Sequence, residues 1–267
     1  MDHLTGMAVF AKVVETGTFT GAAQAMGLSK GAVSKQIAKA EEAELAVTRL
    51  HAEPRGVLRV NLPMSFGMIH MADALPDFMA AYPEISLDVT LDDRVVNVVD
   101  EGYDVVIRIT DLPDSSLIAR RIAPFRIATC ASSAYWDAHG RPKHPDDLRN
   151  HACLLYSYLS NLNEWRYRGP DGPFSVRVDG PMRGNNGDLL RAAAVAGLGV
   201  VRSPTFIVGC HLVEGRLEQV LAEYEDDDRG IYAVYPHNRH LSAKVRAFVD
   251  FMAKRFADPQ WVCMNVT

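Results

Sequence analysis

The sequence predicts an α/β protein that has a small helical head and a larger body. Three observations support this class: helical spacing of apolar residues near the N-terminus, alternating strand and helix patterns after residue 55, and an ordinary composition. The 267 residues are 48% hydrophobic and 23% charged, which is typical of a folded globular chain. A chain of this length can form one large domain or two smaller ones.

The sequence carries no signal for a membrane or for secretion. No apolar run approaches the roughly 20 residues that a membrane helix needs. The N-terminus places Asp2 and Glu15 in an amphipathic pattern, without the basic segment and apolar core of a secretory signal. We therefore expect a cytoplasmic protein. The four cysteines are widely spaced and the nine histidines form no His-x-x-x-His pair, so neither a disulfide framework, a metal site nor a cofactor is expected.

Charge is unevenly distributed between head and body. The first 40 residues hold four lysines against Asp2 and Glu15, a net charge of +2, which leaves −7 of the total of −5 for the remaining chain. A cationic head on an acidic body favours contact with a polyanion.

Residues 1–40 are predicted to form three short helices. The first is indicated by residues at helical spacing, Leu4, Met7, Ala8, Ala11 and Val14. Gly17 ends it, and Thr20 is expected to cap a second helix over Gly21–Met26. After the turn at Gly27, Ser29 is a good N-cap for the third helix because its hydroxyl can accept an unpaired N–H of the first turn.

The third helix has the composition that insertion into a DNA major groove requires. Val33, Ile37 and Ala40 share one face, whereas Lys35 and Lys39 lie one turn apart on the opposite face. Small residues permit close approach, lysines meet phosphates, and polar side chains can reach base edges. A solvated polar face on a small helical bundle would give the same pattern, so this stretch alone leaves both interpretations open.

The stretch MAVFAKVVETGTFTGAAQAMGLSKGAVSKQIAKAE, residues 7–41, resembles the helix-turn-helix of LysR-type transcriptional regulators. The alanine pair Ala22-Ala23, the GLS turn and the AVSKQIAK run match in order and spacing. In that family the helix that begins at the GLS serine reads the major groove. The resemblance therefore implies DNA contacts at seven positions, Ser29, Lys30, Gly31, Ser34, Lys35, Gln36 and Lys39.

The sequence departs from the family after this helix. LysR-type proteins continue into a two-stranded wing, an LTEAG-like segment and a long dimerising linker helix. Here QIAKAEE runs directly into AELAVTRLHAEPRG, which resembles only the end of the linker. We expect residues 41–55 to form a shortened linker helix without a wing. Because each lost phosphate contact weakens DNA binding and flattens its salt dependence, we expect impaired binding.

The body is predicted to alternate strands and helices. Its elements follow a β-α-β-α-β order, Val57–Pro63, Ser65–Ala81, Ser86–Leu91, Val95–Glu101 and Val105–Ile109. This order implies a parallel sheet with right-handed crossovers. Later, GNNGDLLRAAAVAGLGVV predicts a helix and a strand, and Ile231–Tyr235 predicts a last strand before a closing helix, Ala243–Phe256.

The stretch from Gly56 to about Phe256 resembles the LysR-type effector-binding domain. The runs RGVLRVNLP, LPDFMAAYPEISLDV, DVVIRI, LIARRIAP and LRAAAVAGLGVV occur in family order. The resemblance implies a two-subdomain fold like that of the type 2 periplasmic binding proteins, with a ligand cleft between the subdomains. One subdomain would be 56–124 with 230–257, the other 125–229, followed by a tail, 258–267.

The resemblance also gives candidate effector contacts at the ends of strands and starts of helices. They are Met64, Ser65, Phe66, Arg108, Thr110, Asn185, Asn186, Ser203 and Thr205. Helix N-termini attract carboxylates through their unpaired N–H groups, so a small effector, of the carboxylate class, is expected. Structural alternatives stay open, since Asn186 could simply cap its helix and Arg108 could pair with an acid.

Three functions remain open. The first is a LysR-type regulator whose partners are double-stranded promoter DNA, a small effector, further copies in a homodimer or homotetramer, and RNA polymerase. The second is a ligand-binding, dimerising remnant that sequesters intact relatives instead of binding DNA. The third is an enzyme, which we do not expect because the sequence offers no nucleophile with a base and no metal set; Cys130 is a lone thiol.

Overall fold

A computed structural model describes residues 2–38, 53–109, 117–159, 163–225, 229–236, 242–259 and 261. Its contacts divide the chain into two compact units, Met1–Pro54 with Asn238–Ala243, and Arg55–His237 with Lys244–Thr267. Lys39, Thr110 and residues 41–52 of the predicted linker helix lie outside the described residues, whereas its last three residues, 53–55, are described and are not helical. Within them, no helix is long and apolar enough to cross a membrane.

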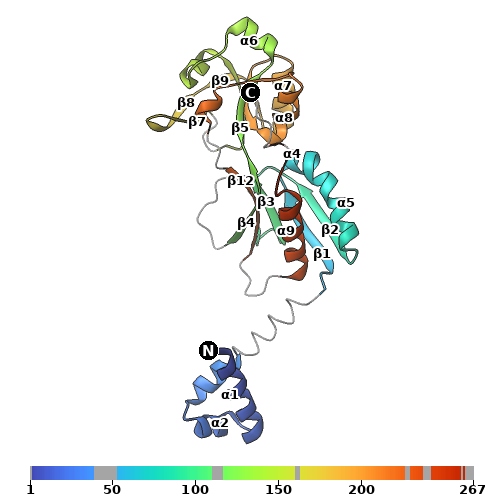
Figure 1. Ribbon diagram of the computed structural model, residues 1–267, viewed down its shortest axis with the longest axis vertical. Coiled ribbons are helices and arrows are strands. Elements are labelled where there is room, and N and C mark those ends of the chain that lie inside the picture. The colour runs from blue at the N-terminus through green and yellow to red at the C-terminus, as the bar shows by residue number, and fades with distance from the viewer. Residues whose placement is uncertain are drawn as a thin grey trace. The chain divides into compact units, whose positions relative to one another are not determined.

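The head is a small bundle of three helices (Figure 1). They are α1, Asp2–Thr16, α2, Phe19–Met26, and a third helix described over residues 30–38. Its buried core consists of Val9, Ala22, Ala23, Val33 and Ile37. The third helix therefore buries Val33 and Ile37, as the sequence predicts.

Two details of the head differ from the prediction. In α1 the buried residue is Val9, with Val13 partly buried, whereas Ala8, Ala11 and Val14 are exposed. Seven of the eight residues 7–14 are apolar, so their spacing fits more than one face and tertiary packing selects between them. The N-cap of α2 is Thr18, whose hydroxyl accepts the Gly21 N–H at 3.0 Å; Thr18, not Thr20, has the extended backbone that an N-cap requires.

The body contains two five-stranded sheets. The first has the order β2-β1-β3-β12-β4. Its strands are β1, Gly56–Leu62, β2, Ile85–Leu91, β3, Val105–Ile109, β4, Leu117–Phe125, and β12, Arg229–Pro236. β1 is parallel to β2 and to β3, which confirms the predicted parallel core, while β12 runs antiparallel to β3 and β4.

The predicted helix Ser65–Ala81 is a continuous helical run. It comprises α4, Met64–Phe66, a π-helical turn, Gly67–Met71, and α5, Ala72–Ala81. The closing helix is α9, Ala243–Arg255. Phe78 of α5 packs against Phe248 of α9 with ring centroids 5.3 Å apart, so these two helices lie together against the first sheet (Figure 1).

The predicted helix Val95–Glu101 is wrong, because this segment forms turns. β-branched valines fill much of it and disfavour a helix. Asn97 supplies a competing local structure, since its side-chain oxygen accepts the N–H groups of Val99 at 3.1 Å and Asp100 at 3.4 Å.

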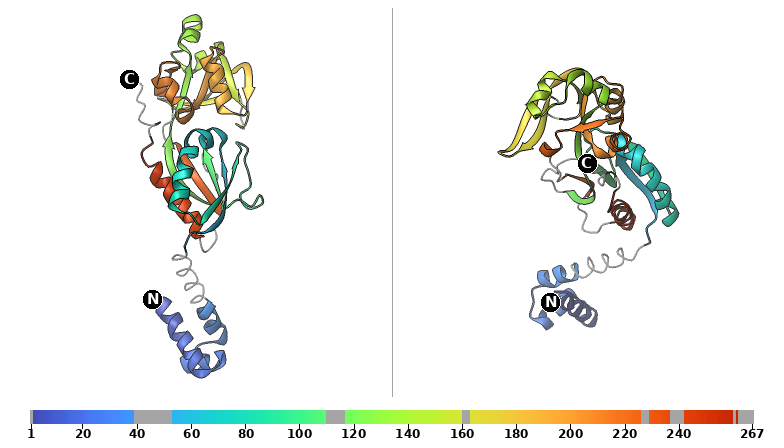
Figure 2. Two further views of the ribbon diagram at one scale, coloured as in Figure 1. Left: turned by 90° about the vertical axis from the view of Figure 1, so that its right-hand side faces the viewer. Right: turned by 45° about the horizontal axis from the view of Figure 1, so that its top comes forward.

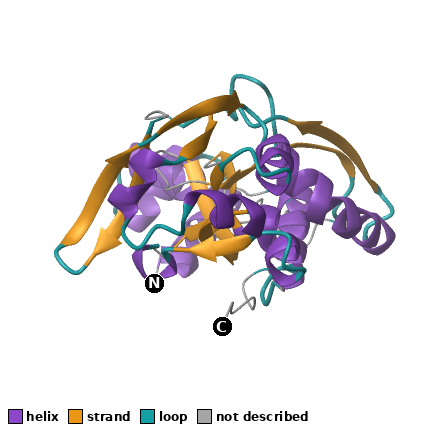
Figure 3. Ribbon diagram, turned by 90° about the horizontal axis from the view of Figure 1, so that it is seen from above, coloured by secondary structure: helices purple, strands orange, loops and turns teal. Residues whose placement is uncertain are grey.

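The second sheet has the order β11-β5-β10-β6-β9. Its strands are β5, Ile127–Ala131, β6, Ala152–Tyr156, β9, Asp179–Gly184, β10, Val200–Pro204, and β11, Glu218–Val220. Its helices are α6, Ser133–His139, α7, Gly187–Val195, and α8, Thr205–Val213, with short 3-10 turns at Pro145–Asn150 and Ala222–Tyr224. A separate hairpin, β7, Glu164–Gly169, with β8, Gly172–Arg177, projects from the body (Figure 3).

The chain passes from the first sheet to the second at Arg126, between β4 and β5 (Figure 2, left). Later in the chain, the 3-10 turn Ala222–Tyr224 still belongs to the second sheet's part of the body, and the next described strand, β12, is again in the first sheet. The junction between the two sheets is where the predicted effector residues are concentrated.

Candidate functional sites

The first candidate site is the outer face of the third helix of the head. Five of its predicted contact residues are exposed, Ser29, Lys30, Gly31, Ser34 and Lys35, and Gln36 is half-buried. The Ser29 hydroxyl accepts the Ala32 N–H at 3.1 Å, which confirms its predicted role as N-cap.

Two lysines on this face, Lys30 and Lys35, form no ion pair within the described part of the chain. On α1, by contrast, Lys12 pairs with Glu15 at 2.9 Å. Lys30 and Lys35 have no such partner among the described residues, so their charges are available to a polyanion. The bundle therefore offers a small, cationic, exposed helix face, which is what groove binding requires.

The second candidate site lies at the junction of the two sheets, where Ser65 meets the start of α7. Ser65 is 4% exposed, and its hydroxyl has no hydrogen-bond partner among the described residues. A Cβ placed on Gly187 would lie 3.5 Å from the Ser65 Oγ and 2.6 Å from Ile207 Cδ1. Glycine thus allows the start of α7 to approach Ile207 closely, and a methyl group at Gly187 would be in ordinary van der Waals contact with the Ser65 hydroxyl. The Asn186 side chain accepts the Leu189 N–H at 3.0 Å, so Asn186 caps α7.

Phe66 faces an aromatic cluster at the same junction rather than an open surface. It is fully buried. Its ring centroid lies 5.5 Å from those of His70, Phe206 and Phe256 and 5.8 Å from that of Trp261. Phe206 belongs to α8, so this cluster joins elements of both sheets.

A polar group, which sequence reasoning missed, lies beside Met64. The Met64 N–H donates to Asp93 at 2.8 Å, and Asp93 also hydrogen-bonds to Tyr156 from the second sheet. Burial raises the pKa of the Asp93 carboxyl, and burial together with Asp93 raises the pKa of Tyr156. Asn185 lies two residues before the start of α7, and its side-chain amide donates to the Tyr158 hydroxyl at 3.3 Å.

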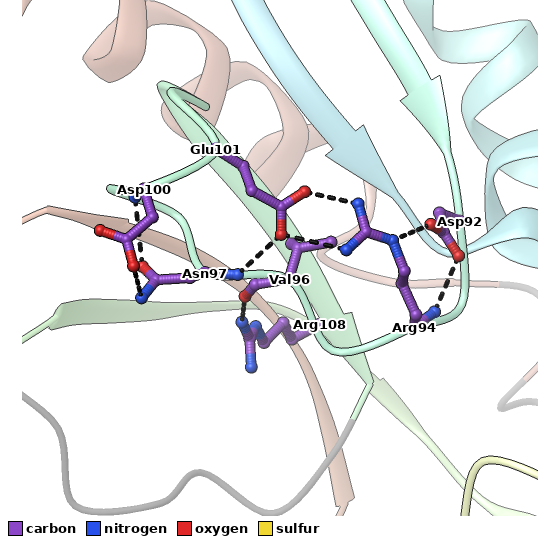
Figure 4. A network of polar contacts seen from close by, with 7 residues as sticks. All are labelled: Asp92, Arg94, Val96, Asn97, Asp100, Glu101 and Arg108. Carbon is purple, nitrogen blue, oxygen red and sulfur yellow. Dashed lines mark hydrogen bonds and ion pairs between the residues drawn. The ribbon is translucent and has the colours of Figure 1, made fainter.

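Arg108 is held elsewhere in the first sheet. Its guanidinium donates to the carbonyl of Val96, within the turn segment 92–101 (Figure 4). That segment is fixed by Arg94, which bonds Asp92 and Glu101 at 2.5 Å each. The same guanidinium lowers the pKa of Glu101. The described partner of Arg108 is therefore a carbonyl and not an acid, and no contact brings it to Ser65.

Thr205 and Ser203 lie where the chain crosses between the sheets. The Thr205 N–H donates to the Arg126 carbonyl at 2.8 Å, and the Thr205 hydroxyl accepts the Arg126 N–H at 3.4 Å. Ser203 is buried in β10, opposite Ala128 of β5. Both residues thus support the crossing point. Among the described residues, no group of three or more His, Cys, Asp or Glu could hold a metal ion.

Comparison with known families decides the classification. The family described as "LysR substrate binding domain" matches residues 51–257, and "Bacterial regulatory helix-turn-helix protein, lysR family" matches residues 4–59. The chain belongs to the LysR family of transcriptional regulators. Both expected parts of a LysR protein, the helix-turn-helix and the substrate-binding domain, are therefore present.

Individual LysR proteins match along nearly the whole chain. An uncharacterized HTH-type transcriptional regulator of Haemophilus influenzae is 31% identical over 281 residues, covering 92% of this chain and 98% of that protein. The transcriptional regulator DmlR of Escherichia coli K12 is 31% identical over 293 residues, covering 96% and 95%. The solved structure of CrgA, a LysR-type regulator from Neisseria meningitidis, has a TM-score of 0.69 at 25% identity and covers 95% and 99%.

The lengths of these alignments carry further information. The alignment to the Haemophilus protein spans 281 positions but only 92% of this chain, about 246 residues, a difference of about 35. This LysR relative therefore has residues without a counterpart in this chain.

Proposed function

We propose that this LysR-family chain is a DNA-binding transcriptional regulator that is controlled by a small-molecule effector and acts in the cytoplasm. The observation that carries the proposal is the capped third helix of the head, whose exposed face holds Lys30 and Lys35 without ion-pair partners among the described residues. Such a face fits the major groove of promoter DNA. We propose no cofactor and no enzymatic activity, because the relatives are named as transcriptional regulators.

For the effector, we propose the junction where Ser65 meets α7. The Ser65 hydroxyl, which has no partner in the part of the chain that the structure describes, and the N-terminal turn of α7 suit an acceptor such as a carboxylate oxygen. Asp93 and Tyr156, beside Met64, suit a donor group on the same molecule. A small molecule that holds one arrangement of the subdomains would change how paired heads meet DNA, by no more than its differential affinity for the two arrangements.

For partners, we propose promoter DNA, further copies of the chain in a homodimer or homotetramer, and RNA polymerase. Closed symmetric assembly is the usual form of soluble oligomers. Paired heads would then engage two half-sites on one face of the duplex.

A second candidate function is a dimerising, ligand-binding remnant that sequesters intact relatives. Its support is that the Haemophilus relative has residues, about 35 alignment positions, without a counterpart in this chain. If the missing residues include cations that would contact DNA phosphates, binding to DNA would be weak.

Fluorescence anisotropy separates the two functions. Labelled DNA from upstream of the gene and a random duplex of equal length are each titrated with the protein. The mass of the protein alone is measured by sedimentation. Preference for the upstream DNA supports the regulator. Equal and weak affinity for both duplexes, together with a dimer mass, supports the remnant.

A further inference from the structure

The two sheets of the body meet at a narrow crossing point. β4 ends at Phe125 and β5 begins at Ile127, so Arg126 alone separates them. The backbone of Arg126 is bonded on both sides by Thr205, at the start of α8. A rotation of one subdomain relative to the other would change the backbone dihedral angles of Arg126, because connections of a few residues absorb such motions.

In the described part of the C-terminal tail, Trp261 contacts this crossing point. After α9, Ala257 and Asp258 are exposed, whereas Pro259 is buried and Trp261 is only 7% exposed. The Trp261 indole N–H donates to the Pro124 carbonyl at 3.1 Å, two residues before Arg126. A tryptophan that is buried with its N–H paired contributes a large apolar contact in one fixed orientation.

The indole supports the residues that hold the second subdomain. Its ring centroid lies 4.3 Å from that of His70 and 5.8 Å from that of Phe66. His70 in turn hydrogen-bonds through Nε2 to the Phe206 carbonyl at 2.9 Å, and Phe66 packs edge-on against the Phe206 ring. Trp261 thus packs against Phe66 and His70, the two side chains of the first subdomain that contact Phe206 in the first turn of α8.

The backbone that presents His70 is also unusual. His70 belongs to the π-helical turn Gly67–Met71, between α4 and α5. Such turns are rare and insert a wider coil into a helix. His70 lies in this wider turn, where its ring contacts both Trp261 and α8. The turn belongs to the same helical run that begins with Met64 and Ser65.

We propose that Trp261, which follows α9, acts as a strap over this crossing point. With Trp261 inserted, Phe66 and His70 are held against α8 and the two subdomains keep one arrangement. When Trp261 withdraws, the contacts of Phe66 and His70 loosen and the second subdomain turns about Arg126. Ser65 adjoins Phe66, so the strap also sets the geometry of the junction. The contacts that support this strap are independent of whether the chain binds DNA or an effector.

Hydrogen-deuterium exchange of the full chain tests the strap. Trp261→Ala is compared with wild type and with Trp165→Phe, a control tryptophan buried in the core of the second subdomain. We expect Trp261→Ala to raise exchange at least tenfold in peptides covering 64–71, 122–128 and 203–208, with α6 and the β7–β8 hairpin unchanged. Unchanged exchange in those three segments, or an even rise across the whole body, overturns the proposal.

A distance measurement provides a second test, with a milder variant in case the alanine variant does not fold. Spin labels are placed at Lys254→Cys, on α9, and Lys143→Cys, in the second subdomain, after Cys210 and Cys263 are replaced by serine. Trp261→Phe keeps an aromatic ring but loses the donor to Pro124. We expect it to broaden the distance distribution, and Trp165→Phe to leave it unchanged. Identical distributions for Trp261→Phe and wild type contradict the strap.

Discussion

Loss of one member of a buried ion pair is expected to destabilise the second subdomain severely. Arg202 Nη2 lies 2.6 Å from Glu225 Oε2, and the two side chains are 10% and 2% exposed. The Thr129 hydroxyl donates to the same carboxylate at 2.7 Å, and the Arg202 guanidinium lies 5.0 Å from the centre of the Tyr167 ring. Arg202→Met removes the cation and leaves Glu225 as a buried charge without its partner.

The expected cost follows from that burial. Breaking a buried pair by removing one partner costs about 3–5 kcal/mol, because the remaining charge is desolvated without compensation. The double variant Arg202→Met/Glu225→Leu removes both charges, so we expect it to lose roughly 1 kcal/mol or less. For a body of this size, about 2–4 °C of melting temperature corresponds to each kcal/mol, which gives a fall of roughly 6–20 °C for Arg202→Met.

Differential scanning calorimetry of the full chain measures both variants, and the transition of the body is followed separately from that of the head. A surface control, Arg120→Met, removes a cation that is 45% exposed and paired with Asp250; we expect a change below about 1 kcal/mol. The reasoning is refuted if Arg202→Met melts within about 2 °C of wild type, a shift of about 1 kcal/mol or less, or if the double variant is as unstable as Arg202→Met.

Three further predictions follow from single sites. Gly187→Ala should destabilise the body by about 1–3 kcal/mol, because the new methyl group collides with the side chain opposite α7; an unchanged melting temperature contradicts this. Burial lowers the pKa of His70, so the unfolded chain takes up the proton first and stability falls as pH drops below about 6.5; His70→Gln should show a smaller loss of melting temperature between pH 7.5 and 5.5, and an equal loss refutes it. Cys210 is exposed and should react with a thiol reagent in the native protein, whereas Cys130 and Cys153 should react only on unfolding, since burial raises the pKa of both, that of Cys153 to about 12; labelling followed by peptide mass analysis decides.

Local patterns were sufficient for the parallel core of the body. β1, β2 and β3 follow from alternation and from apolar runs, because a buried strand leaves that signature in neighbouring residues. The segment 95–101 was predicted wrongly because side-chain bonds of Asn97 outweigh a weak helical pattern. The buried face of α1 could not be chosen because seven of the eight residues 7–14 are apolar and fit more than one face.

The candidate site was only partly predictable for a different reason. Ser65 and Asn186 could be located by resemblance, since both stand at the start of a helix. Asp93 and Trp261 could not, because their partners, Tyr156 and His70, are distant in sequence and no periodic pattern records such contacts. Trp261 follows the last helix, where a sequence pattern indicates only a tail.

The most direct test of the central claim is the salt dependence of DNA binding. Wild type, Lys30→Ala/Lys35→Ala and the control Lys143→Ala are titrated against upstream DNA by fluorescence anisotropy at several salt concentrations. If a dimer places both lysines of each head on phosphates, four contacts are lost, and the slope of log K against log salt should flatten by about 3–4 in the double variant and not in the control. Equal slopes for wild type and the double variant would contradict the assignment of this helix as the DNA-reading element.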